Sequence, residues 1–134
     1  SAYISLALAT KILKEIDPHN TFFEKNDVNI HIPEGAVEKD GPSAGVTLTT
    51  LLLSLATGVK VDPLLGMTGE ITLTGRILAV GGINEKLLGA ERSGLKRICL
   101  PEDNRADYDE IDERLKKEFD SVDFFSEYND LYQH

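Results

Sequence analysis

The sequence is poor in cysteine and in positive charge. A single cysteine, Cys99, excludes a disulfide within the chain, so nothing in the composition marks an oxidising compartment. Cys99 lies in the apolar segment 97–100, where we expect a small buried thiol rather than a reactive one. Against 23 acidic residues there are only 14 basic ones, and the net charge of -9 argues against nucleic acid or an anionic membrane as a partner.

Long apolar runs are also missing. No stretch approaches the roughly 20 apolar residues that a membrane-spanning helix needs, and the richest, residues 46–56, contains Thr and Ser. The chain begins with Ser and shows no basic or apolar leader, so we expect an excised domain or a processed fragment. Its 134 residues, 41% of them hydrophobic, suffice for one core but not for two, so we predict a single domain over residues 1–134.

Motifs for phosphate and metal binding are missing too. The nearest approach to the phosphate loop Gly-x-x-x-x-Gly-Lys-Ser/Thr is the segment from Gly69 to Gly75, which has the wrong length and is followed by Arg76. Nothing resembles a cluster of metal ligands. We therefore expect no metal or organic cofactor in this chain, and no binding or hydrolysis of ATP by this chain alone.

Helical and strand-like patterns alternate along the sequence. Helical spacing over residues 2–16 predicts a helix whose buried face holds Ile4, Ala7, Leu8, Ile12 and Ile16. Further helices are predicted from Ser43 to a cap at Gly58 and over residues 83–92, with a charged helical stretch and a terminal helical turn later. Strands are predicted at residues 28–32, 97–100 and 122–125, with a hairpin joining 69–73 to 77–80. The alternation indicates an α/β layered domain, a mixed sheet with packed helices.

Ser43 lies in the segment 39–45, Lys-Asp-Gly-Pro-Ser-Ala-Gly, where a loop becomes a helix. A serine hydroxyl is a weak nucleophile unless a nearby group accepts its proton. Small neighbours leave room for a substrate backbone, and N–H groups at a helix start can stabilise an oxyanion. An ordinary helix N-cap has the same appearance. An α/β-hydrolase is disfavoured, because a Pro-rich loop precedes Ser43 and the only later histidine is His134.

Two residues are candidates for the base. His31 lies on the predicted strand that leads into the Ser43 loop, although a structural or substrate-lining role is commoner for such a histidine. Lys86 has apolar neighbours in Ile83 and Leu87, which could bury its amine and so favour the neutral form that accepts a proton. A solvated lysine on an amphipathic helix is the ordinary alternative. Neither Ser43 nor Lys86 alone decides the function.

Four blocks of sequence resemble, in order and spacing, the motifs of the proteolytic domain of the ATP-dependent Lon proteases. They are residues 31–36 (HIPEGA), 39–45 (KDGPSAG), 67–75 (MTGEITLTG) and 81–86 (GGINEK), and residues 101–104 (PEDN) resemble the segment that follows them. The resemblance implies that Ser43 is the nucleophile, that Lys86 is its base and that the Thr68 hydroxyl orients the lysine amine. It also implies that Asp40 and Glu34 are loop acids beside the active site.

The resemblance further implies a serine endopeptidase that hydrolyses unfolded or damaged proteins through an acyl-enzyme. Members of this family assemble as hexameric rings, and their ATP and Mg²⁺ are bound by an AAA+ module, which is absent from this sequence. Bacterial cytoplasm and mitochondrial matrix are both compatible locations. The family's domain begins with further β-rich sequence, so we expect some N-terminal strands to be missing. The alternative function is a non-catalytic Lon-like scaffold that oligomerises and displays a binding groove.

Overall fold

The computed structural model describes residues 2–26 and 45–133. Within these ranges the strands form two sheets. The larger sheet is parallel, with the order β1-β4-β5, and consists of Leu65–Met67 (β1), Arg97–Pro101 (β4) and Ser121–Phe125 (β5). Glu70–Ile71 (β2) and Ile77–Leu78 (β3) form an antiparallel pair. The predicted α/β class is confirmed, and the parallel and antiparallel pairings belong to separate sheets.

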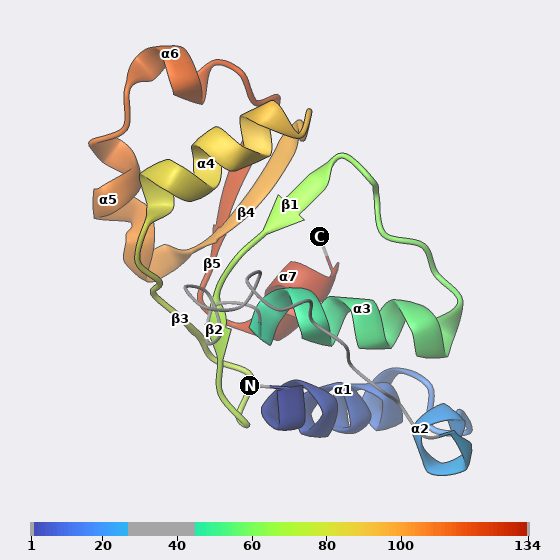
Figure 1. The fold of residues 1–134 in the computed structure, drawn as a ribbon. Helices are drawn as coiled ribbons and strands as arrows, with labels where there is room; N and C mark the ends of the chain where they lie inside the picture. Colours follow the sequence, from blue (N-terminus) through green and yellow to red (C-terminus); the bar gives the residue numbers. More distant parts are fainter. Residues whose placement is uncertain (1, 27–44, 134) are drawn as a thin grey trace.

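Helices lie on both sides of the parallel sheet (Figure 1). On one side, Ala2–Ile16 (α1) packs along Gly45–Thr57 (α3), and Tyr128–Gln133 (α7) lies beside α3. The Tyr128 hydroxyl, which is buried, forms a 2.6 Å hydrogen bond with Thr50 of α3. The other side carries four short helices: Ile83–Arg92 (α4), Glu102–Asn104 (η2, a 3-10 turn), Arg105–Asp109 (α5) and Glu113–Lys116 (α6). Phe22–Lys25 (α2) follows α1.

β4 divides the interior into two hydrophobic cores. Side chains alternate along a strand, so Cys99 points into the core that α1, α3 and α7 share. Ile98 and Leu100 point the other way, into the core beneath α4 and α6. A strand covered on both faces needs apolar side chains at successive positions, which explains the run that predicted this strand.

The buried face of α1 differs from the predicted one. The stripe that packs against α3 consists of Ser5, Leu8, Ala9, Ile12 and Leu13, at the spacing i, i+3, i+4, i+7 and i+8. Ile16, which we placed on the buried face, is 44% exposed because it ends the helix. Ser5 is fully buried and its hydroxyl donates to the Gly45 carbonyl at 3.1 Å. A polar residue therefore belongs to the stripe because α3 supplies its partner.

The helix predicted at residues 83–92 is confirmed with its bounds, and the strands predicted at 97–100 and 122–125 are each one residue longer. Two other predicted elements are shorter or more broken. The hairpin pairs only two residues on each strand. The charged stretch folds as η2, α5 and α6 rather than as one helix. Neither β1 nor α2 was predicted. The strand predicted at residues 28–32 and the start of the helix at Ser43 lie outside the described residues. Within those residues, no helix has the length and apolar character needed to span a membrane.

Candidate active site

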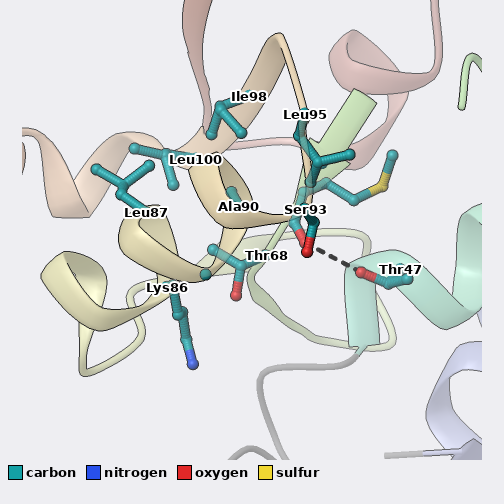
Figure 2. Close-up of a pocket in the computed structure, with 12 residues that line it drawn as sticks. Thr47, Thr68, Lys86, Leu87, Ala90, Ser93, Leu95, Ile98 and Leu100 are labelled. Atoms are coloured by element: carbon teal, nitrogen blue, oxygen red, sulfur yellow. Dashed lines mark hydrogen bonds between the residues drawn. The ribbon is translucent and has the colours of Figure 1, made fainter. Parts of the chain in front are cut away.

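A pocket of about 380 Å³ opens between the start of α3, the end of β1 and one side of α4 (Figure 2). Its lining is mainly apolar, and the polar side chains come from α3, from the residue after β1 and from α4 with its C-cap. Apolar side chains come from Met67, Leu87, Ala90, Leu95, Ile98 and Leu100, and polar ones from Thr47, Thr68, Lys86 and Ser93. Figure 2 shows the Lys86 amine and the Thr68 hydroxyl at the same side of this pocket. The arrangement suits an apolar group held next to a lysine.

Lys86 is positioned by the first turn of α4. The helix begins after Gly82, whose φ of 68° is a left-handed conformation that glycine adopts without strain. Ile83 and Leu87 are buried at 4% and 1% exposure and anchor the helix in the second core. Lys86 lies between them in the sequence, so its side chain leaves the flank of the helix and is half-buried at the pocket.

Thr68 follows directly after β1. Its backbone N–H donates to the Cys99 carbonyl at 3.3 Å, which extends the pairing of β1 with β4 by one residue. The chain then turns at Gly69, where a Cβ atom would lie only 2.8 Å from the methyl groups of Ile77 and Val46. Glycine at this position lets the chain turn at the pocket wall, so Thr68 sits at the strand end where the side chain faces the cavity.

Two hydrogen bonds fix the first turn of α3 to the same strand end, and a close approach fixes it to β2. The Val46 N–H donates to the Gly69 carbonyl at 3.1 Å, and the Thr47 hydroxyl donates to the Met67 carbonyl at 3.1 Å (Figure 2). A Cβ on Gly45 would lie 2.8 Å from a methyl group of Ile71, so only glycine allows this approach. The helix start that follows Ser43 in the sequence is thus fixed beside Thr68 and the pocket.

The structure brings two of the predicted site residues together, since Lys86 and Thr68 line one pocket. Ser43, Asp40, Glu34 and His31 lie outside the described residues, and their roles stay predictions. In the part of the chain that the structure describes, no group of three or more His, Cys, Asp or Glu residues could hold a metal ion.

Cys99 is buried beside the site but does not belong to it. Burial raises the pKa of its thiol to about 11, and the nearby Asp123 carboxylate adds to that increase, while Arg97 opposes it. The thiolate is the reactive form of cysteine, so the environment disfavours nucleophilic chemistry here. The predicted small buried thiol is confirmed.

Asn104 is a residue whose importance the sequence did not reveal. It is 1% exposed, and its side-chain amide bonds both the N–H and the carbonyl of Val80, at 2.9 and 2.8 Å. Val80 immediately precedes the two glycines from which α4 begins. In the sequence, Asn104 follows soon after Pro101, which ends a strand. An asparagine in that position is equally typical of a surface turn, so the sequence did not indicate a buried role.

These features define an α/β domain in which a strand end, a helix start and a half-buried lysine meet at one pocket. The family model for the Lon protease (S16) C-terminal proteolytic domain matches residues 1–134. The chain therefore belongs to the family of Lon C-terminal proteolytic domains, as the sequence motifs indicated.

Curated relatives agree with this assignment. The chain is 51% identical over 134 residues to a mitochondrial Lon protease homolog of Caenorhabditis elegans, covering 100% of this chain and 14% of the relative. It is 52% identical over 133 residues to a Lon protease of Chlamydia trachomatis, covering 99% of this chain and 16% of the relative. A mitochondrial Lon protease homolog of Caenorhabditis briggsae is 50% identical over 134 residues, with 100% and 14% covered. The chain thus spans about one seventh of the length of these relatives.

Proposed function

We propose that the chain is the catalytic domain of an ATP-dependent protease, a serine endopeptidase in which Ser43 is the nucleophile and Lys86 the base. The observation that carries the proposal is the shared pocket, because Thr68 and Lys86 come from separate motifs and line the same cavity. Membership of the Lon proteolytic family and relatives named Lon protease support it independently.

The proposed reaction is an acyl transfer. The neutral Lys86 amine takes the proton of the Ser43 hydroxyl while the serine oxygen attacks the peptide carbonyl carbon. Backbone N–H groups at the start of the Ser43 helix stabilise the oxyanion. The protonated lysine then gives its proton to the leaving amine, and a water molecule, activated in the same way, hydrolyses the acyl-enzyme. Thr68 orients the lysine amine throughout.

The place of Thr47 supports this arrangement. Ser43 precedes it by four residues, so a helix that starts at Ser43 as predicted carries both residues on one face. Thr47 lines the pocket with Lys86 and Thr68, and that face of α3 is turned toward the pocket. The mainly apolar lining is suited to an aliphatic or aromatic side chain of the substrate, next to the bond that is cut.

Partners, cofactors and location belong to the same proposal. Unfolded or damaged proteins are the substrates, and we expect Glu34 and Asp40 in the predicted loop, with His31 on the predicted strand before it, to lie near them. The domains assemble as a homo-oligomer, a hexameric ring in this family. ATP and Mg²⁺ are bound by an AAA+ module outside this sequence, and the proteolytic domain itself needs no cofactor. Relatives that are named mitochondrial, together with Lon proteases of bacteria, support the mitochondrial matrix or bacterial cytoplasm.

Substitution of the two proposed catalytic residues tests this function. In the protein at its full natural length, Ser43→Ala and Lys86→Ala should each reduce the degradation of casein at least about 100-fold. ATP hydrolysis should continue, because the substitutions leave the AAA+ module intact. Lys117→Ala is the matched control, since Lys117 is exposed and lies outside the pocket. Degradation at the unsubstituted rate by either active-site variant would show that the assignment of Ser43 and Lys86 as the catalytic pair is wrong.

A further inference from the structure

The side chain of Asn104 uses its full donor capacity within the fold. Its Oδ1 atom accepts from the Val80 N–H at 2.9 Å. Its amide nitrogen donates two hydrogen bonds, one to the Val80 carbonyl at 2.8 Å and one to the Asp107 carboxylate at 2.8 Å. The amide thus pairs with Val80 as a neighbouring strand would, by exchanging an acceptor and a donor with the same residue.

The Val80 side chain packs against the second core, but the two glycines that follow it have little support of their own. Gly81 and Gly82 follow Val80 and are exposed. A Cβ built on Gly81 would meet no described atom within 4 Å, and one on Gly82 would meet only the Glu85 carboxylate at 3.5 Å. A pair of unpacked glycines is conformationally permissive, so packing of the glycines themselves does not fix where α4 begins.

Lys86 belongs to the turn that starts at this point. Its backbone N–H donates to the Gly82 carbonyl at 3.0 Å, so a change in the Gly82 position is passed on to Lys86 through one hydrogen bond. Buried Ile83 and Leu87 hold the inner face of the helix. The hydrogen bonds from Asn104 add to this restraint, because they hold the backbone of Val80 just before the two glycines at which α4 begins.

We propose that Asn104 is a positioning residue for Lys86, which holds Val80 so that the first turn of α4 presents the amine at the pocket. This inference rests on the proposed function, because a positioned amine matters only if Lys86 acts in the reaction. Asp107 has a supporting part, since its carboxylate accepts the amide proton that Val80 does not use.

The test is a set of substitutions in the protein at its full natural length, measured by steady-state hydrolysis of a fluorogenic peptide. Asn104→Asp keeps the size of the side chain and an acceptor for the Val80 N–H, but it replaces the amide nitrogen by an oxygen that faces the Val80 carbonyl and the Asp107 carboxylate. We expect kcat to fall about 10- to 100-fold with KM nearly unchanged, because displacement of a reacting group by about 1 Å costs that much. The pH at which kcat is half-maximal should also shift.

Two further variants separate positioning from stability. Tyr128→Phe removes a buried hydrogen bond in the other core, where Thr50 keeps its bond to the Val46 carbonyl, and should lower Tm without changing kcat or the pH profile. The double variant Asn104→Asp/Asp107→Asn restores a donor to the carboxylate at position 104 and should recover part of the lost kcat. If Asn104→Asp does not fold, Asp107→Ala removes one of the three bonds and should still lower kcat.

The two proposals fail in different ways. Full activity of Lys86→Ala would overturn the proposed function. If Lys86→Ala is inactive while a folded Asn104→Asp retains the kcat and pH profile of the unsubstituted protein, only the role of Asn104 is wrong. If Asn104→Asp does not fold, an unchanged kcat in Asp107→Ala overturns the proposed role of Asn104.

Discussion

Replacement of Gly69 by alanine should destabilise the domain strongly, because this glycine joins the strand end that carries Thr68 to the start of α3. Its φ of 152° is a conformation that favours glycine. A Cβ atom would lie 2.8 Å from methyl groups of Ile77 and Val46. Both neighbours are buried and β-branched, with 2% and 0% exposure, so neither can rotate away without disturbing its own packing.

The expected loss follows from these two effects. Backbone strain in a region populated mainly by glycine costs about 1–3 kcal/mol. Overpacking of a well-filled interior costs a further 1–3 kcal/mol or so. A total of about 4 kcal/mol lowers Tm by roughly 10–15 °C in a domain of this size.

Two other glycines provide matched controls for Gly69→Ala. A Cβ on Gly58 would have open space around it, but the φ of 75° is unfavourable for alanine. Gly58→Ala should therefore lower the free energy of unfolding by only about 1 kcal/mol. Gly89→Ala lies within α4 with open space around its Cβ and should stabilise by about 0.5–1 kcal/mol. Thermal unfolding followed by circular dichroism measures all three. A Tm for Gly69→Ala within about 2 °C of the unsubstituted chain would refute the packing described between Thr68 and α3.

Three further predictions concern Cys99 and Leu87 in the two cores. Because burial raises the pKa of Cys99 to about 11 while an unfolded thiol ionises near pH 8.5, the folded chain keeps a proton that the unfolded chain loses. The free energy of unfolding should therefore fall as the pH rises from about 8.5 to 11, and the fall should be shallower in Cys99→Ala. Reaction of Cys99 with a disulfide reagent at pH 8 should be slow in the native chain and fast in urea, and equal rates would contradict its burial. Leu87→Ala should cost about 2–5 kcal/mol in urea unfolding, since Leu87 is 1% exposed, whereas Leu88→Ala, at 37% exposure, should cost under half as much.

The sequence predicted those elements whose patterns are long or sharply ended. α1, α3 and α4 have helical spacing and stop at a turn or a glycine, and β4 is apolar at successive positions because both of its faces are covered. β1 has three residues and is half-buried throughout, so it has no period to detect. The charged segment breaks into three short pieces, and α6 begins after Asp112, whose side chain caps the helix by accepting from the Arg114 N–H.

The site was predictable only in part, for a physical reason. Motif order indicated that Thr68 and Lys86 belong together, and the structure places both at one pocket. The restraints that hold them depend on tertiary contacts with no local signature. Ser5 is buried because Gly45 offers a carbonyl, and Asn104 is buried because Val80 offers both backbone groups. Neither partner could be inferred from spacing along the chain.

The most direct test of the central claim is labelling by a fluorophosphonate probe, which phosphonylates an activated serine. Mass spectrometry of the digested protein identifies the labelled residue and gives the rate of labelling. Activation of Ser43 by Lys86 predicts a covalent adduct on Ser43 that forms about 100-fold more slowly in Lys86→Ala. A Ser43 that remains unlabelled, or that reacts at the same rate without Lys86, would contradict the claim that these two residues form the catalytic pair.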